Sequence, residues 1–210
     1  MLAPRLLIDN DILLLLAGAQ LLEPAVTVLG FSLADTYQLG TLAHILRGSK
    51  HFRHLPDGLK TDVIQGCQPV PVLQTTPNTD ALQQLSDVVD IDDGEALLYG
   101  LLAEKPYYLL TTNDKRAMRA VATKPALQTI RRTVTGRIIC LETVLLRLIE
   151  QNGVTAVAQA LAPVTPENTL LRVYFSSGNL ANPLECKHVL HHYLEALTDQ
   201  VGADFLWKGT

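Results

Sequence analysis

Short, largely apolar runs alternate with helical segments along the first 150 residues, and this alternation limits the fold more than any other feature of the chain. The runs occupy residues 6–8, 26–33, 70–73, 107–111 and 137–140. A strand with apolar residues at consecutive positions is typical of a parallel sheet that helices cover on both faces. We therefore predict an α/β fold with three α/β/α layers around a central parallel sheet of about five strands.

Helix signals separate these runs. The clearest helix opens at Asp92, where Glu95 three residues later forms an aspartate-headed capping box, and it ends before Pro106. The predicted helices of this part cover residues 12–18, 35–46, 80–86, 92–104, 114–123 and 141–150.

The pattern changes after residue 150. An alanine-rich helix is expected over 154–161 and a longer helix over 182–200, whereas 171–175 fits either a strand or a helix. We predict one domain over residues 1–150 and a mostly helical C-terminal extension over 151–210.

Composition excludes several classes of protein. The net charge of −4 at neutral pH argues against a basic nucleic-acid coat, so contacts with RNA must come from local basic clusters or bridging metal ions. The three cysteines are widely spaced, which fits a reducing, cytoplasmic compartment better than a disulfide framework. Asp9 and Asp11 interrupt the apolar N-terminal run, so neither a secretory signal nor a membrane span is expected.

Three acidic residues that are distant in the sequence are expected at one edge of the sheet. Asp9 and Asp114 follow the carboxyl ends of two strands, and Glu95 lies in the first turn of the helix that leads into the second. In a parallel α/β sheet all three positions fall on the carboxyl edge, where such folds bind ligands. Each residue also has a structural interpretation, because Asp9 can form a turn, Glu95 can complete a capping box and Asp114 can begin a helix.

Carboxylates gathered in this way need neutralisation. Two of them about 5 Å apart repel by roughly 3 kcal/mol at an effective dielectric of about 20. A proton or a cation relieves this repulsion, and a site made only of oxygen ligands suits Mg²⁺ or Mn²⁺. A water bound to such an ion can attack phosphorus, which is the chemistry of phosphodiester hydrolysis. Lys115 and Arg116 follow Asp114 directly and are candidates to hold a substrate phosphate.

Four segments resemble the PIN domain family of metal-dependent ribonucleases. They are LLIDNDILLLL (6–16), DDGEALLYGLL (92–102), LLTTNDKRAMRAV (109–121) and GRIICLETVLLRLI (136–149). The resemblance covers about residues 5–150 and implies an endoribonuclease that requires Mg²⁺ or Mn²⁺. Its acidic positions match Asp9, Glu95 and Asp114 as catalytic metal ligands.

The resemblance also suggests neighbouring roles and partners. Asp11 matches a further polar position beside the metal, and Thr112 and Asn113 lie where substrate is expected. Many members of the family are toxins of bacterial toxin–antitoxin pairs, so RNA, an antitoxin-like protein and a second copy in a homodimer are the partners it implies. One position differs: the family places a glutamate in the helix after the second strand, whereas residues 35–39 read Asp-Thr-Tyr-Gln-Leu.

Two other functions fit the same motifs. Asp9-Asn10-Asp11 and the threonines before Asn113 resemble the motifs of haloacid-dehalogenase phosphatases, in which Asp9 would be the nucleophile. No paired-acid motif of that family follows residue 114. The missing helix glutamate favours a third function, a non-catalytic PIN-like module that binds RNA or protein. The basic stretch over 47–60 is either an RNA clamp or a solvated loop.

Overall fold

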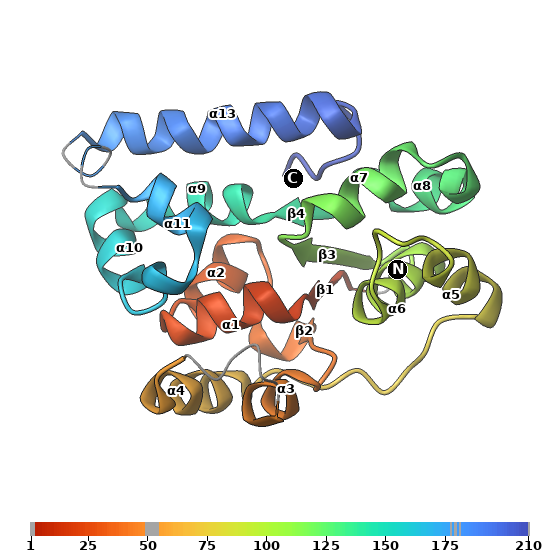
Figure 1. Cartoon of the computed structure of the whole chain (residues 1–210), viewed down its shortest axis with the longest axis horizontal. Coiled ribbons are helices and arrows are strands. Elements are labelled where there is room, and N and C mark those ends of the chain that lie inside the picture. Colours follow the sequence, from red (N-terminus) through yellow and green to blue (C-terminus); the bar gives the residue numbers. More distant parts are fainter. Residues whose placement is uncertain (1–2, 49–54, 177, 179, 181, 210) are drawn as a thin grey trace.

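The computed structural model describes residues 3–48, 55–176, 178, 180 and 182–209. Four strands in this part form one sheet: β1 (Arg5–Ile8), β2 (Thr36–Tyr37), β3 (Tyr108–Thr112) and β4 (Ile138–Cys140). They pair in parallel throughout, in the order β2-β1-β3-β4 (Figure 1). The predicted α/β class and parallel sheet are confirmed, with four strands where about five were expected.

Helices occupy most of the remaining described chain. Between the strands and directly after β4 lie α1 (Asn10–Gly18), α2 (Leu22–Val28), α3 (Leu42–Gly48), α4 (Asp57–Cys67), α5 (Thr79–Ser86), α6 (Asp93–Glu104), α7 (Lys115–Thr123), α8 (Gln128–Val134) and α9 (Leu141–Asn152). The C-terminal region contains α10 (Val154–Leu161), α11 (Thr169–Tyr174) and α13 (Pro183–Val201). Short 3₁₀ turns cover Leu33–Asp35, Pro125–Leu127 and Thr165–Glu167.

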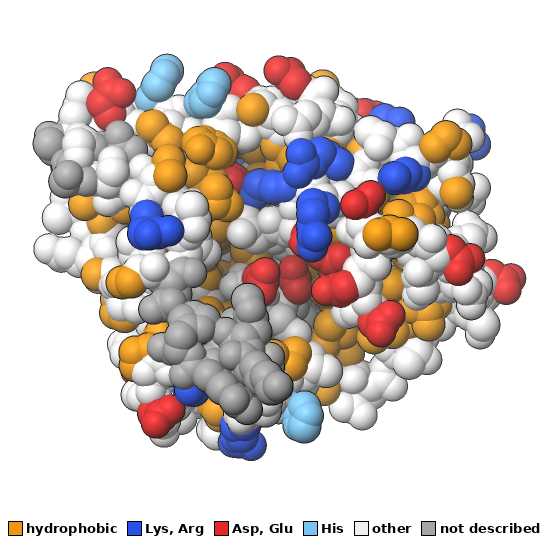
Figure 2. Space-filling view, in the orientation of Figure 1, with side chains coloured by type: hydrophobic (Ala, Val, Ile, Leu, Met, Phe, Trp, Pro, Cys, Tyr) orange, Lys and Arg blue, Asp and Glu red, His pale blue; other side chains and the backbone are white. Residues whose placement is uncertain are grey.

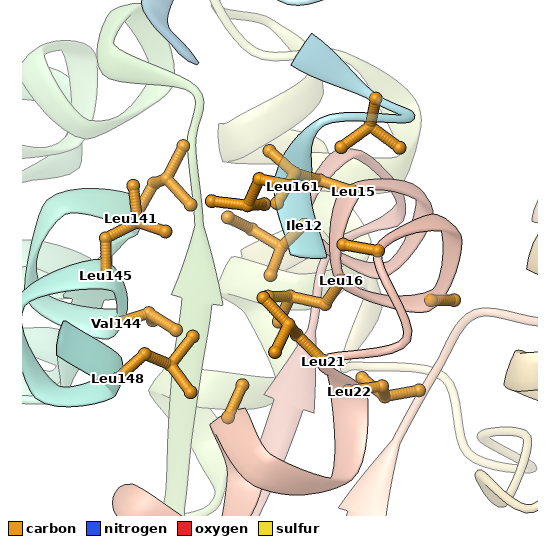
Figure 3. Packing of buried hydrophobic residues seen from close by; sticks show 14 of the residues in the cluster. Ile12, Leu15, Leu16, Leu21, Leu22, Leu141, Val144, Leu145, Leu148 and Leu161 are labelled. Carbon is orange, nitrogen blue, oxygen red and sulfur yellow. The ribbon is translucent and has the colours of Figure 1, made fainter. Parts of the chain in front are cut away.

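The sheet separates two hydrophobic cores. Because side chains alternate along a strand, Leu6 and Ile8 of β1 enter one core and Leu7 enters the other. Figure 3 shows the first core, where α1, α2 and α9 bring their leucines together. Residues of α6, α7 and α8 fill the second core on the opposite face. The strands are therefore buried on both sides, which explains their unbroken apolar sequence.

Two predicted elements on the first half of the chain are wrong. Residues 26–33 were expected as a strand, but α2 covers Leu22–Val28 because Leu22, Ala25 and Val26 are buried at helical spacing and α2 packs on α9. The helix expected over 35–46 is instead the edge strand β2 followed by α3. In the predicted strand 70–73, only Val72 pairs, through a parallel bridge to Gln38.

The basic stretch 47–60 is only partly visible. Residues 49–54 lie outside the described residues, while Arg47 lies in the last turn of α3 and Lys60 belongs to α4.

The C-terminal region packs closely on the preceding residues. Helix α13 lies along α9 and α7, and Figure 1 shows it crossing one side of the molecule. Beyond it, Leu206 forms a parallel bridge with Ile138, and the Trp207 N–H donates to the Ile138 carbonyl at 2.8 Å. Phe205 is fully buried in the second core. Residues after 150 thus contribute to both cores, and the boundary at residue 150 stays a prediction.

No single helix among the described residues is long and apolar enough to cross a lipid bilayer. All three cysteines of the chain are buried and free.

Candidate functional site

The carboxylate of Asp9 points across the sheet. Asp9 follows β1 and occupies the N-cap position of α1, yet its side chain makes no capping hydrogen bond. Its Oδ2 instead accepts a hydrogen bond from Thr112 Oγ1 at 2.8 Å, at the end of the neighbouring strand β3. The turn-forming interpretation of Asp9 is therefore insufficient, because the carboxylate is bound to the end of the neighbouring strand.

Burial changes the charge state of Asp9. It raises the pKa of this carboxyl group to about 6; the Thr112 hydrogen bond acts in the opposite direction, and the nearby charges of Asp11 and Asp92 raise the pKa further. Asp11 itself is exposed in the first turn of α1. The predicted ligand Asp11 thus lies close enough to Asp9 to affect its ionisation.

Glu95 serves the helix and the site together. Its backbone N–H donates to Asp92 Oδ1, and its Oε2 accepts from the Asp92 N–H, both at 2.8 Å, so the predicted capping box is confirmed. The side chain is almost completely buried. Burial is the main cause of its raised pKa. The hydrogen bond from the Asp92 N–H lowers this pKa, whereas the neighbouring carboxyl groups of Asp114 and Asp92 raise it.

Asp114 is the ionised partner of Glu95. It caps α7 by accepting from the N–H groups of Arg116 and Ala117 at 2.7 and 2.8 Å. Burial alone would raise its pKa, but these two bonds, the hydrogen bond from Glu95 and the charge of Arg116 lower it below its usual value. The pKa of Glu95 is thus raised and that of Asp114 lowered, so Asp114 is the stronger acid of the two.

The charges of all three acids act on the buried side chain of Tyr99. It lies one helical turn after Glu95 in α6, and its hydroxyl is buried with no hydrogen-bond partner among the described residues. Burial raises the pKa of Tyr99, and the charges of Glu95, Asp9 and Asp114 raise it further. One buried hydroxyl thus lies within the field of all three predicted acids. Thr112 links two of them directly, since its Oγ1 donates to Asp9 and accepts from the Asp114 N–H.

Two other buried oxygens have no partner within the described part of the chain. They are Asn10 Oδ1, next to Asp9 in the chain, and Thr111 Oγ1, one residue before Thr112 in β3. Unsatisfied buried polar atoms are rare in folded proteins, and water or an ion commonly completes them. Asn10 Oδ1 is therefore an oxygen next to Asp9 that a bound water or ion can satisfy.

As arranged here, the acids form no complete coordination shell. Among the described residues, no group of three or more His, Cys, Asp or Glu side chains is positioned to hold a metal ion. The opposite pKa shifts of Glu95 and Asp114 show that each of these carboxyl groups affects the ionisation of the other. A cation that binds here must displace any acidic proton and turn at least one of the carboxylates.

The predicted substrate residues divide into two groups. Thr112 is buried, donates to Asp9 and accepts from the Asp114 N–H at 3.2 Å, so it positions the acids. Asn113 is half-buried and accepts from Lys115 Nζ at 2.8 Å. The Arg116 side chain is 72 % exposed and lies 3.4 Å from the Asp114 carboxylate. Figure 2 shows Lys and Arg side chains directly beside a group of Asp and Glu side chains on this face.

Sequence reasoning missed Glu142. It lies in the first turn of α9, directly after β4, and its side chain is fully buried. Its Oε2 accepts from Lys115 Nζ at 3.0 Å. The rule that identified Asp9 and Asp114, an acid at the carboxyl end of a parallel strand, also applies to Glu142.

Comparisons with protein-family models, with curated proteins and with solved structures found no match for this chain. The function must therefore be inferred from the site itself.

Proposed function

We propose that this chain is a PIN-like ribonuclease that hydrolyses RNA phosphodiester bonds with Mg²⁺ or Mn²⁺ at Asp9, Glu95 and Asp114. The observation that carries the proposal is the link through Thr112 at the carboxyl edge of the sheet, where its Oγ1 donates to Asp9 Oδ2 and accepts from the Asp114 N–H. Glu95 lies close enough to Asp114 for the two carboxyl groups to shift each other's pKa. Buried acids with shifted pKa values at this edge are typical of catalytic sites.

The charge states support a site that exchanges protons for a cation. The pKa values of Asp9 and Glu95 are raised, mainly by burial, and that of Asp114 is lowered. Cation binding would release a proton from the groups with raised pKa, since the ion neutralises the same negative charge more completely. A divalent ion bound there would supply an activated water and stabilise the charge that develops on the phosphate.

The residues around the acids have complementary roles. Thr112 holds Asp9 in place, and the capping box with Asp92 fixes Glu95 at the start of a rigid helix. Arg116 is exposed beside Asp114 and can pair with a substrate phosphate. An antitoxin-like partner and a homodimer belong to the same proposal.

Calorimetric titration with Mn²⁺ at pH 7 tests the metal site. We expect binding with release of about one proton per ion, measured in two buffers that differ in ionisation enthalpy. Asp9→Asn should abolish binding while the protein stays folded. The control is Asp93→Asn, which changes an exposed acid in the first turn of α6, the helix that carries Glu95, and should bind as the wild type does.

A nuclease assay on single-stranded and structured RNA tests the chemistry. The wild type and Asp93→Asn should cleave with Mg²⁺ or Mn²⁺, and Asp9→Asn should not. Cleavage that persists unchanged in folded Asp9→Asn would remove the proposal.

A non-catalytic PIN-like module is the second candidate. The opposite pKa shifts of Glu95 and Asp114 favour it, because a proton on the weaker acid neutralises part of the charge without a metal. A folded wild-type protein that gives no heat with Mn²⁺ would favour this candidate over the nuclease.

A further inference from the structure

A buried polar chain joins the C-terminal region to the acidic edge. The Tyr174 hydroxyl, at the end of α11, donates to Glu142 Oε1, and Lys115 Nζ donates to Glu142 Oε2 at 3.0 Å. Tyr174 and Glu142 are both completely buried. Residues of α7, α9 and α11 therefore meet at one carboxylate.

Glu142 is held as an anion. Burial pushes its pKa upward, but the Lys115 charge and the hydrogen bonds from Tyr174 and Lys115 outweigh burial and leave the pKa below its usual value. A buried carboxylate without these partners would be strongly unfavourable. Tyr174 thus helps to keep a negative charge in place at the carboxyl end of β4.

That charge fixes the position of Lys115. The ammonium group has three donors, and among the described residues it uses two of them, to Glu142 and to Asn113 at 2.8 Å. The Lys115 side chain is 20 % exposed and directly follows Asp114 in the chain. One donor therefore remains for a group that approaches the acidic edge from solvent.

Tyr174 is in turn fixed by the C-terminal helix. Its ring packs edge-to-face on Tyr193 of α13, with centroids 5.2 Å apart and planes at 76°. Tyr193 provides a matched control, since its ring contacts the ring of Tyr174, while the side chains that donate hydrogen bonds to Glu142 in the described part of the chain are those of Tyr174 and Lys115.

We propose that Tyr174, acting through Glu142, is a positioning residue that holds the Lys115 ammonium beside Asp114 to bind a phosphate group of the RNA substrate. The inference rests on the proposed function for its substrate. The proposal gives Tyr174, in the region after residue 150, a role in substrate binding at the site.

Reductive methylation of the Lys115 amine, followed by mass spectrometry, tests the positioning without any substrate. Tyr174→Phe and Glu142→Gln should both label Lys115 severalfold faster than the wild type, and Tyr193→Phe should not. Tyr174→Phe should add nothing in a Glu142→Gln background, because the tyrosine acts through the glutamate. A wild-type labelling rate of Lys115 in folded Tyr174→Phe would overturn the inference. If Tyr174→Phe or Glu142→Gln does not fold, the labelling rate of the other variant decides.

Binding of a phosphorothioate RNA oligonucleotide over a range of salt concentrations tests the role of Lys115. Loss of one phosphate contact should reduce the slope of log affinity against log salt by about 0.7 for a single strand. We expect this reduction of the salt slope in Lys115→Gln and part of it in Tyr174→Phe. In cleavage of unmodified RNA, both variants should change KM more than kcat. An unchanged slope in Lys115→Gln would overturn the phosphate role.

The two proposals fail separately. If the wild type binds RNA and the slopes change as expected, but no variant or wild type hydrolyses it, the nuclease function is wrong and the positioning holds. If Asp9-dependent hydrolysis occurs and Tyr174→Phe matches the wild type in labelling and KM, the positioning is wrong and the nuclease function holds.

Discussion

The surroundings of Asp9 favour its protonated form, and the same is true of Glu95 next to Asp114. Asp9 lies at the end of a strand and Glu95 in the first turn of a helix. The fold therefore buries both carboxyl groups despite this electrostatic cost. Residues that reduce stability in this way are common at functional sites, where the unfavourable charge is retained for binding.

Asp9→Asn should stabilise the metal-free protein at neutral pH. Because folding raises the pKa of Asp9 from 3.8 to about 6, its contribution to stability is complete below pH 4 and is lost as the pH rises through 6. Asparagine does not titrate and can still accept the Thr112 hydrogen bond. We expect a gain of about 1–3 kcal/mol at pH 7 that shrinks toward pH 4, measured by urea unfolding in EDTA. Equal stabilities at pH 7 would contradict the burial of this charge.

Two substitutions of Glu95 should separate its structural and chemical roles. Glutamine keeps the acceptor that completes the capping box, so Glu95→Gln should lose activity with little loss of stability. Glu95→Ala removes the acceptor as well and should cost about 1–2 kcal/mol more in thermal or urea unfolding. If both variants unfold alike, the capping contribution of Glu95 is negligible.

At the scale of elements, tertiary contacts decided where local preference was weak. The β-branched residues of 26–33 favour a strand, yet Leu22, Ala25 and Val26 bury one face of α2 against α9. The edge strand β2 is only two residues long, so its sequence carries almost no periodicity. By contrast, the α6 capping box and the apolar β1 and β3 runs act locally, and these elements were predicted at their observed positions.

Two glycine-to-alanine substitutions should have opposite effects. A Cβ on Gly100 of α6 would stand 2.8 Å from the Pro77 side chain, whereas a Cβ on Gly58 of α4 would meet nothing within 4 Å. Gly58→Ala should therefore stabilise the protein by about 0.5–1 kcal/mol through helix propensity. Gly100→Ala should destabilise it despite the same propensity gain, as measured by urea unfolding. A stabilised Gly100→Ala would mean that the 74–78 segment moves freely away from α6.

At the scale of the molecule, the C-terminal region completes both cores. Leu161, Leu171 and Leu190 enter the first core, and Phe205 and Leu206 enter the second. This sharing predicts that the chain unfolds as one cooperative unit.

Phe205→Ala should cost about 3–5 kcal/mol, because the side chain is fully buried. The chain has one tryptophan, Trp207, so its fluorescence reports on the C-terminal segment while far-UV circular dichroism reports on all helices. Both signals should change in a single coincident transition in the wild type. Leu184→Ala is the control, since Leu184 is 75 % exposed and its loss should change stability by no more than about 0.5 kcal/mol. Separate transitions would show that the C-terminal region folds on its own.

Local patterns in the chain were enough to predict the parallel α/β class and to place Asp9 and Asp114 at the ends of neighbouring strands. Apolar strands, helix caps and strand-end acids are such patterns, and parallel topology brings strand ends to one edge. The folded chain was needed to show that Thr112 links Asp9 to the Asp114 backbone, that the Tyr99 hydroxyl is buried, and that Tyr174 reaches Lys115 through Glu142. These depend on burial and on contacts between distant helices, which no local pattern encodes.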